Sequence, residues 1–477
     1  MLEDILRKPR SIYYAMPAWQ KAIVGNLYHT IPQRLRLGRQ YAKFKKLLET
    51  SEYWSKQQWE EFQYLELLHT ITIAYEHVPY YKKSFGAHGL TPADFTCIAD
   101  IQKFPTLSKK DIQENRDELI AKNIPSWRHL LTTTGGSTAE PLSLLHEKGI
   151  TRSKERAFIW NGWSRVGYYP HARTIQFKGR SVGNPQKDIF WEYEPIQGFL
   201  EMDSNYLTES RIPLYLDAMR DFKPEFLIGY ASSIYQLARF LKNCSRNDSP
   251  SFKAVCLTSE NVYPWQREYL EDVFGCRIFS HYGQSEMVLL GMECEESHNL
   301  HFFPQYGYLE VMDVAGNLLD KPGETGELVG TSFHNRVMPL IRYRMQDYGS
   351  IGEPDCKCGR QYPIINDVEG RLQEFIVTAD NRLISICVMG AAHFNIADFV
   401  YETQYYQDQP GHIVFRVVPR GNFDEKKKAI IVNTLKSKLG ADVTIEIDVV
   451  EQLKKSQNGK HIMIEQKLSV PTYMDKG

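Results

Sequence analysis

Three segments of this 477-residue chain combine glycine, hydroxyl and carboxyl groups in patterns that suit a nucleotide. In residues 134–138 (Thr-Gly-Gly-Ser-Thr), glycines let backbone N–H groups close on an anion, and hydroxyls add hydrogen-bond donors. Residues 282–286 (Tyr-Gly-Gln-Ser-Glu) offer a flat ring for a base, a hydroxyl for a phosphate and a carboxylate for Mg²⁺. Asp347 follows an expected strand, where a carboxylate can accept both ribose hydroxyls. Each segment taken singly is also compatible with an ordinary turn or a surface salt bridge.

Cys356 and Cys358, with one residue between them, suit a metal better than a disulfide bridge. Cys294 and His301 lie upstream, and three thiolates with one imidazole would form a closed tetrahedral Zn²⁺ site. His298 is the competing imidazole. Because the pairs are far apart in sequence, spacing alone leaves zinc binding and four unligated side chains equally open. Four protein ligands would make such a site structural rather than catalytic.

The elements that must position these groups follow from periodicity. Short β-rich runs alternate with helical runs, which predicts βαβ units and a mainly parallel sheet; the strands are expected at Thr174–Phe177, Phe226–Gly229, Ala254–Thr258 and Arg277–His281, and the helices at Ser233–Lys242 and Trp265–Phe274. Tyr282 then lies at a strand end, where ligands dock in open α/β sheets. Upstream, residues 52–82 have helical periodicity until Pro79, and Ser108 is the expected N-cap of another helix.

Two regions later in the chain do not follow this alternation of strands and helices. Short strands joined by Gly-rich turns are expected at Gly307–Met312, Gly326–Thr331 and Ile341–Arg344. At the end of the chain, a strand at His412–Val418, a helix at Phe423–Leu439 and a strand at Val443–Val449 predict a compact α+β unit. A polar loop in this unit, residues 454–460, presents Lys460.

Composition excludes several classes of protein. Hydrophobic residues make up 42% and charged residues 24%, so the chain is neither collagen-like nor largely disordered. The formal net charge of −1 gives no support for nucleic acid as the main partner. Eight cysteines are too few for a disulfide scaffold, and neither a secretory signal nor a spanning helix is apparent. We therefore expect a cytoplasmic protein.

In this order, residues 134–138, residues 282–286, Asp347, residues 356–360 with 368–374, and residues 454–460 resemble the motifs of the adenylate-forming superfamily. The match is closest to its phenylacetate–CoA ligase-like branch, which includes the CapK proteins of polysaccharide clusters. Residues Tyr75–Glu114 also look like the N-terminal region of that branch, and the similarity covers roughly residues 60–465. The resemblance implies an α/β fold with a large N-terminal domain, residues 1–371, that has mainly parallel sheets and a β-rich subdomain. A small mobile α+β domain, residues 372–477, would follow.

The resemblance also implies roles for individual positions. The nucleotide-binding positions of the family fall on Thr134, Gly135, Gly136, Ser137, Thr138, Ser259, Glu260, Tyr282, Gly283, Asp347 and Arg371. Within these, Tyr282 would stack on adenine, the backbone around Ser259 and Glu260 would line the adenine pocket, and Arg371 belongs to the hinge motif. The catalytic positions fall on Ser285 at the α-phosphate, Glu286 as the Mg²⁺ ligand and Lys460.

The sequence departs from the family pattern in three places. Ala139 replaces a usual glycine of the phosphate loop, and Met345-Gln346 replaces the commoner Thr-Gly before the ribose-binding aspartate. Gln373 occupies a hinge position that usually holds Asp or Lys, which concerns the rate of domain rotation rather than adenylation.

The resemblance implies an ATP-dependent ligase that activates a carboxylic acid as an acyl-AMP, with CoA as the default acceptor. One alternative is transfer to an amine, for example on a sugar of a surface polysaccharide. A second is a non-catalytic nucleotide-binding partner in polysaccharide assembly, against which the presence of Glu286, Asp347 and Lys460 together argues. Acyl-pocket walls are expected at residues 229–233 and Trp160–Trp163.

Residues 1–46 are strongly basic, with ten Lys and Arg residues against Glu3 and Asp4, and apolar and aromatic residues are interleaved. Such a segment either packs as a solvated cap on the large domain or lies on an anionic membrane surface. The second interpretation predicts peripheral contact with the inner face of the membrane.

Overall fold

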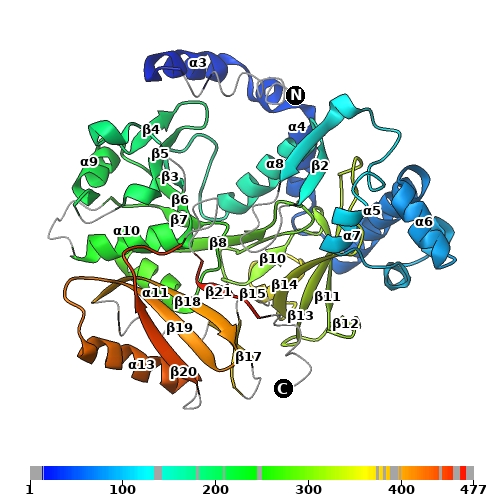
Figure 1. The fold of residues 1–477 in the computed structure, drawn as a ribbon. Helices are drawn as coiled ribbons and strands as arrows, with labels where there is room; N and C mark the ends of the chain where they lie inside the picture. The colour runs from blue at the N-terminus through cyan, green and yellow to red at the C-terminus, as the bar shows by residue number, and fades with distance from the viewer. Residues whose placement is uncertain are drawn as a thin grey trace.

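The computed structural model describes residues 13, 16–133, 142–178, 182–207, 210–243, 250–371, 375–379, 383–386, 396, 399–439, 443–454 and 462–468. A 13-stranded sheet runs through the larger part of the molecule, in the order β12-β11-β13-β14-β15-β10-β9-β8-β7-β6-β3-β5-β4 (Figure 1). A four-stranded sheet near the C-terminus has the order β20-β19-β18-β21, and two hairpins, β1-β2 and β16-β17, stand apart from both sheets. Among the described residues, no helix has the length and hydrophobicity needed to cross a bilayer.

The N-terminal region is helical, with α3 at Ala18–Thr30, α4 at Gln33–Ser51, α5 at Lys56–His77, α6 at Pro79–Ala87 and α7 at Lys109–Glu114. The predicted helical run is divided at Val78, which is extended because Pro79 disfavours a helical residue before it. Ser108 caps α7 as predicted: its hydroxyl accepts the Asp111 N–H at 3.2 Å, and the Asp111 carboxylate accepts the Ser108 N–H at 2.8 Å. Short 3₁₀ turns lie at Pro92–Asp94, Ile98–Lys103, Ser126–Arg128, Pro185–Lys187 and Ser204–Tyr206.

One half of the large sheet is parallel, as predicted. It contains β3 (Thr174–Lys178), β5 (Phe199–Asp203), β6 (Phe226–Gly229), β7 (Ala254–Leu257) and β8 (Arg277–Gly283), with β4 (Trp191–Glu194) antiparallel at the edge. The accompanying helices are α8 (Thr151–Ser164), α9 (Ile212–Phe222), α10 (Ala231–Asn243) and α11 (Pro264–Phe274). Every residue of β6 and β7 is buried, as expected for central parallel strands covered on both faces.

The other half is antiparallel and continues from β8 without a break. Its strands are β9 (Leu290–Met292), β10 (Leu300–Phe302), β11 (Gly307–Met312), β12 (Leu318–Leu319), β13 (Thr325–Ser332), β14 (Tyr343–Ile351) and β15 (Ile364–Arg371). The expected β-rich region is therefore an extension of the parallel sheet, joined to it through β8 and β9. The strand predicted at Ile341–Arg344 begins later, at Tyr343, because Arg342 has a φ of 48°, outside the extended range. It also continues to Ile351, so Asp347, predicted to follow the strand, lies within it.

The C-terminal region has its own sheet and core. Its strands are β16 (Phe375–Val377), β17 (Leu383–Ser385), β18 (Val400–Gln409), β19 (His412–Pro419), β20 (Thr444–Val449) and β21 (Ile464–Gln466), with helix α13 at Glu425–Leu439. Phe415, Ile431 and Leu435 are buried together in its core. The region lies beside α10 and α11 (Figure 1), and Arg239 of α10 donates to the Val400 and Tyr401 carbonyls, both at 2.7 Å.

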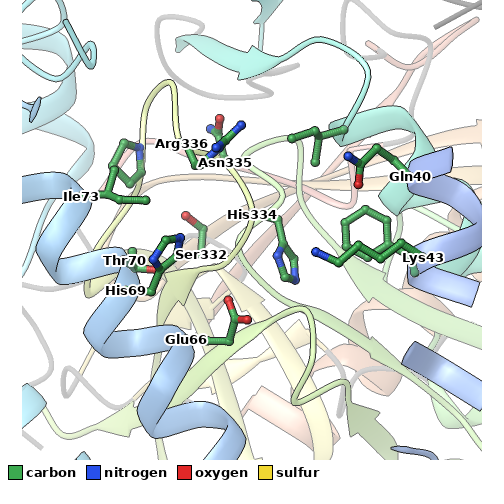
Figure 2. Close-up of a pocket in the computed structure, with 13 residues that line it drawn as sticks. Gln40, Lys43, Glu66, His69, Thr70, Ile73, Ser332, His334, Asn335 and Arg336 are labelled. Carbon is green, nitrogen blue, oxygen red and sulfur yellow. The ribbon is translucent and has the colours of Figure 1, made fainter. Parts of the chain in front are cut away.

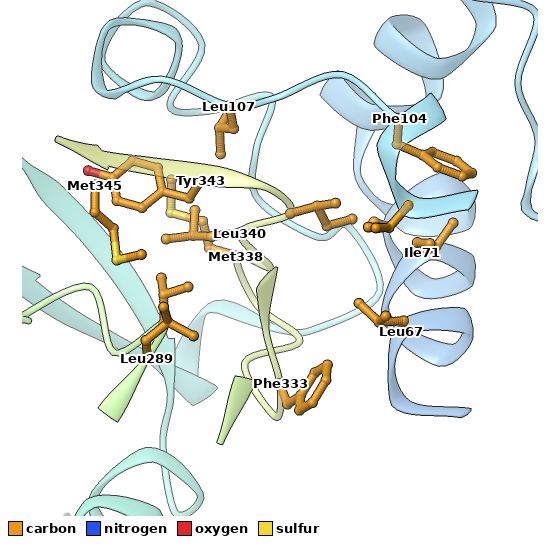
Figure 3. Packing of buried hydrophobic residues seen from close by; sticks show 14 of the residues in the cluster. Leu67, Ile71, Phe104, Leu107, Leu289, Phe333, Met338, Leu340, Tyr343 and Met345 are labelled. Carbon is orange, nitrogen blue, oxygen red and sulfur yellow. The ribbon is translucent and has the colours of Figure 1, made fainter. Parts of the chain in front are cut away.

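A hydrophobic core fixes the strand that carries Asp347. Leu67 and Ile71 of α5 pack with Phe333, Leu340 and neighbouring residues of the β13–β14 connection (Figure 3). Each fully buried side chain of this kind contributes about 1.5–3 kcal/mol. The N-terminal helices therefore stabilise the position of β14 from one side of the sheet.

The β1–β2 hairpin pairs residues His129–Thr133 with Ser143–Glu147, up to Thr133 opposite Ser143. It is held to the β13–β14 connection by Arg336, which donates to the buried Glu147 carboxylate at 2.7 and 3.0 Å. This ion pair fixes the hairpin relative to the large sheet.

Candidate active site

Three neighbouring parallel strands end at one edge of the sheet, and the predicted adenine-binding segments follow them. Strand β6 ends at Gly229, β7 at Leu257 and β8 at Gly283, and the Thr258 N–H donates to the Gly229 carbonyl at 3.1 Å. The carboxyl ends of adjacent parallel strands are the general docking place for ligands in such sheets. The segments that follow these strands, about 25 residues apart in sequence, are therefore brought to one edge of the sheet.

Within the loop after β7, Ser259 is exposed and has a left-handed φ of 64°. The Glu260 carboxylate accepts the Ser232 N–H at 2.8 Å and the Ser232 hydroxyl at 3.0 Å, at the start of α10. The side chain of Glu260 thus has a local structural role that sequence reasoning did not foresee. The backbone of this loop is the part expected to face a base.

The most informative contact joins Tyr282 and Asp347: the phenol donates to the Asp347 Oδ2 at 2.6 Å. Their strands, β8 and β14, are four places apart in the sheet order. In a flat sheet, four spacings of about 4.8 Å would separate them by about 19 Å. The sheet must therefore curl so that its parallel and antiparallel halves converge on this contact.

Glu286 is held by its carboxylate and through the residue that follows it. The Tyr343 phenol donates to Glu286 Oε1 at 3.2 Å. The next residue, Met287, has a φ of 56°, and its carbonyl accepts a 3.4 Å hydrogen bond from the Lys154 ammonium. Lys154 also donates to the Phe333 carbonyl at 3.4 Å and lies 3.6 Å from the ring centre of Tyr306.

Lys154 is buried, and burial lowers its pKa to about 8. Sequence reasoning missed this residue, although a signal exists. Lys154 occupies the buried stripe of α8, three residues after Thr151 and four before Phe158, where an apolar residue is expected. A lysine in such a stripe indicates a buried polar contact.

Strand pairing brings the hinge motif to the same place. Asp347 lies directly opposite Arg371 in the β14–β15 ladder, and Tyr348 lies opposite Gly370. The backbone of the predicted hinge is therefore adjacent to the predicted ribose-binding residue. Gly283 ends β8 opposite Leu290, and Ser285 follows on the exposed part of the same loop.

Two predicted elements lie outside the described residues. They are the phosphate loop, Thr134, Gly135, Gly136, Ser137 and Thr138, and the catalytic lysine, Lys460. The flanks of the second are described: the Gln404 side-chain amide donates to the Lys454 carbonyl at 3.2 Å and to the Ile462 carbonyl at 2.9 Å. Gln404 is buried in β18 and thus joins the two ends of the segment that contains Lys460.

The cysteine and histidine positions form one cluster, which we call the thiol–imidazole cluster: Cys294, His301, Cys356 and Cys358. The four ligand atoms lie within 4.8 Å of one another. Cys294 Sγ is 3.7 Å from Cys356 Sγ, and Cys358 Sγ is 3.4 Å from His301 Nε2. With Zn–S bonds of about 2.3 Å and Zn–N bonds of about 2.0–2.1 Å, tetrahedral edges are about 3.8 and 3.5 Å. The donor set and its spacing therefore fit zinc, and the sulfur separation is far too long for a disulfide.

Hydrogen bonding orients the histidine. His301 is buried in β10, and its Nδ1 donates to the Asn299 carbonyl at 3.1 Å, which directs the Nε2 lone pair toward Cys358. His298, the alternative imidazole, instead contacts the Glu293 carboxylate at 3.2 Å. The structure thus selects His301.

A polar cavity of about 240 Å³ lies elsewhere, between α4, α5 and the β13–β14 connection (Figure 2). Lys43, Glu66, His69, His334 and Arg336 contribute polar groups to its wall. Burial raises the pKa of Glu66. Of the predicted nucleotide-binding residues that the structure describes, none lines this cavity.

Residues 376–467 match the family model of the CapK C-terminal domain. Protein CapK of Staphylococcus aureus is 22% identical over 455 residues, which cover 92% of this chain and 96% of that protein. The phenylacetate-coenzyme A ligase of Pseudomonas putida is 27% identical over 322 residues, which cover 63% of this chain and 68% of that enzyme.

Solved structures share the fold. The 2-hydroxyisobutyryl-CoA ligase is 16% identical and aligns over 89% of this chain and 93% of its own, with a TM-score of 0.69 in the postadenylation state and 0.55 in the thioesterification state. An acyl acid amido synthetase in complex with 2,4-DB is 14% identical and covers 91% and 96% of the two chains, with a TM-score of 0.57. Fold and motif order together define the class of adenylate-forming ligases. The relatives of this chain are CapK and the phenylacetate–CoA ligases, which form one branch of that superfamily.

Proposed function

We propose that this chain activates a carboxylic acid with ATP, forms an acyl-AMP and passes the acyl group to an acceptor. In the first step a carboxylate oxygen attacks the α-phosphorus of ATP, the bond to the bridging oxygen breaks, and pyrophosphate leaves. In the second step a nucleophile attacks the acyl carbon, and AMP leaves. Two anions must meet in the first step, so catalysis consists largely of positioning and charge neutralisation.

The observation that carries the proposal is the Tyr282–Asp347 contact across four strand positions. It joins the residue proposed to stack on adenine to the residue proposed to accept the ribose hydroxyls. A carboxylate has lone pairs for several donors, so Asp347 can hold the phenol and receive ribose hydroxyls as well. A sheet curled to place these two groups together suits a nucleoside.

The remaining roles follow the chemistry of the groups. Glu286 would hold Mg²⁺, which supplies neutralising charge at the phosphates when bound. Residues 134–138 would surround the β- and γ-phosphates with N–H and hydroxyl donors, and Ser285 would donate to the α-phosphate. Lys460 would donate to the carboxylate and the α-phosphate as charge moves toward pyrophosphate.

We infer a boundary between two domains after Arg371, with residues 1–371 forming the large domain and 372–477 the small one. Strand β15, the last element of the 13-stranded sheet along the chain, ends at Arg371, and the CapK C-terminal match begins at residue 376. Rotation about this boundary would bring Lys460 to the nucleotide for adenylation and withdraw it for transfer.

CoA is the first candidate acceptor, because four phenylacetate–CoA ligases are among the relatives. An amine is the second candidate, favoured by the fold shared with an acyl acid amido synthetase and by the CapK match over nearly the whole chain. On the second route the product would be an amide, for example on an amino sugar of a surface polysaccharide.

The test is pyrophosphate release with ATP, Mg²⁺ and a panel of carboxylic acids. We expect release that depends on one class of acid. CoA and amino sugars are then added separately, and mass spectrometry distinguishes a thioester from an amide. Binding of ATP without pyrophosphate release for any acid would instead support a non-catalytic nucleotide-binding partner in polysaccharide assembly.

We also propose that the thiol–imidazole cluster holds a structural Zn²⁺, because four protein ligands leave no open coordination position. The reducing cytoplasm, which we infer as the location, keeps the thiols available for a metal. Peripheral membrane contact is a separate proposal that depends on helix α3.

A further inference from the structure

Helix α3 lies at the periphery of the molecule, where its inner face is held against the β4 region (Figure 1). Lys21 is buried on this face and pairs with Glu192. Gly25 packs so closely on Pro195 that an added Cβ would lie 2.5 Å from the proline Cβ. The helix is therefore anchored in a fixed orientation by side chains on one face.

The outer face of α3 carries a stripe of large apolar residues, which we call the α3 stripe: Trp19, Ile23 and Leu27. Their exposed fractions are 64%, 51% and 62%. Residues four positions apart lie on one side of a helix, so the three form a continuous surface rather than scattered contacts. Because the inner face fixes the helix, this exposed stripe is a defined feature of the fold.

The surrounding sequence is basic without interruption. Residues 16–48 contain seven Lys and Arg residues and no Asp or Glu, although the whole chain has a net charge of −1. Four of these cations are exposed on α4: Arg39, Lys43, Lys45 and Lys46. A local excess of positive charge beside an exposed apolar stripe is typical of a segment that lies in a bilayer interface. Basic residues near an anionic leaflet each contribute on the order of 1 kcal/mol.

We propose that the α3 stripe and the basic residues around it form a docking surface for a membrane that contains anionic lipids. Trp19, Ile23 and Leu27 enter the headgroup region, and the exposed cations of α4 pair with lipid phosphates. A second copy of the chain is a poorer occupant, because a twofold interface would place two basic segments against each other. The inference does not depend on the proposed ligase activity.

The test is vesicle flotation of the full chain. Vesicles of phosphatidylcholine alone are compared with vesicles that also contain phosphatidylglycerol, at low and high salt. We expect the protein to float with the anionic vesicles only, and less so at high salt. Replacing the stripe with serine (Trp19→Ser, Ile23→Ser, Leu27→Ser) should lower binding by about tenfold or more, because burial of three large apolar side chains is lost.

A matched control removes three other exposed apolar side chains, with Trp127→Ser, Leu65→Ser and Val314→Ser. The control should bind as the unmodified chain does, and thermal melts should show that both variants are folded. Equal binding by the stripe variant and the control would overturn the proposal, as would failure of the unmodified chain to float. Analytical ultracentrifugation without vesicles checks the competing occupant: a dimer that only the stripe variant loses would assign the stripe to a second copy.

Discussion

The large sheet carries two side-chain clusters that differ in how completely their polar groups are directed at one another. In the candidate active site, Tyr282, Glu286 and Asp347 are partly exposed, and hydrogen bonds join them to partners on distant strands. In the thiol–imidazole cluster, four ligand atoms converge within 4.8 Å. The first arrangement leaves acceptors for an incoming ligand, whereas the second is complete once a single ion is present. An open site suits turnover, and a closed site suits structure.

The two clusters are also held in place by different parts of the structure. The candidate active site depends on a buried cation, Lys154, which holds the loop of Glu286 through carbonyl contacts. The thiol–imidazole cluster depends on neighbouring strands β9, β10, β14 and β15, whose ends or connections supply all four ligands. Damage to the first should therefore appear in catalytic rates, and damage to the second in stability.

The largest expected effect is on the closed cluster. Zinc should co-purify at one ion per chain, and Cys358→Ser should lose it. We expect this variant to be destabilised on the order of 5 kcal/mol or more, because structural zinc contributes on the order of 10–16 kcal/mol in small peptides. Elemental analysis without a metal-affinity step and urea unfolding measure the two quantities.

The matched control is Cys97→Ser, at an exposed cysteine outside the cluster, which should retain zinc and stability. His298→Ala should also retain zinc, because His298 contacts Glu293 instead. Fully folded protein without zinc would contradict the interpretation of the cluster as a metal site.

The second prediction concerns Lys460. Lys460→Ala should lower pyrophosphate release by about 10²–10³-fold and leave ATP affinity nearly unchanged, because its contacts strengthen as charge develops in the transition state. Transfer from a synthetic acyl-AMP should survive, since the small domain would have rotated away by then. Steady-state release and single-turnover transfer measure the two steps.

Lys454→Ala is the control, because Lys454 is an exposed lysine at the base of the same segment. It should keep pyrophosphate release within about threefold, as expected for an exposed ion pair worth less than 1 kcal/mol. If Lys460→Ala released pyrophosphate at a near-normal rate, the C-terminal motif match would be a coincidence of a Gly-Lys turn.

The sequence could predict the parts of this fold that local patterns determine. The strands at Phe226–Gly229 and Ala254–Leu257 and the cap at Ser108 depend on short-range periodicity and hydrogen bonding, and the structure confirms them. The sequence also predicted that Tyr282 would lie at the end of a strand, and it lies next to the last residue of β8. The late start of β14 was not predictable, because the unusual φ of Arg342 is stabilised by a buried ion pair with Glu310, 32 residues away.

The remaining features of the candidate site depend on tertiary contacts and could not be predicted from the sequence. The Tyr282–Asp347 bond requires the sheet to curl, which no local pattern specifies. Tyr343 acts through a distant partner, so its type alone gave no sign of a role. Lys154 could have been noticed as a lysine in the apolar stripe of α8, but its partners could not have been predicted. His301 could be separated from His298 only when the position of the Asn299 carbonyl was known.

The third prediction tests the buried polar groups near the candidate active site through pH. Burial and the neighbouring Lys154 lower the pKa of His146 to about 4, so it is neutral in the folded chain. Unfolded chains take up its proton near pH 6.5, so stability should fall as the pH decreases from 6.5 to 4, by up to about 3 kcal/mol from this residue. His146→Phe should therefore lose less stability over this range than the unmodified chain.

Urea unfolding at pH 7 and pH 4.5 measures the difference. Any acid-induced loss of metal affects both proteins equally, so the comparison isolates His146. The variant His88→Phe, at an exposed position after α6, should lose as much stability as the unmodified chain. Parallel pH profiles for His146→Phe and the unmodified chain would show that His146 takes up its proton at the same pH in the folded and unfolded states, and would contradict the lowered pKa.

The smallest expected effect is that of Tyr343→Phe, which keeps the ring but removes the hydroxyl that donates to Glu286. A net hydrogen bond is worth about 0.5–1.5 kcal/mol, so the concentration of Mg²⁺ needed for half-maximal pyrophosphate release should change roughly threefold to tenfold. Tyr348→Phe, on the same strand, is the matched control and should leave that concentration unchanged. The comparison distinguishes positioning from packing, because both variants keep an aromatic ring in β14. A loss of maximal rate without a change in Mg²⁺ dependence would show that Tyr343 positions something other than the carboxylate proposed to hold the ion.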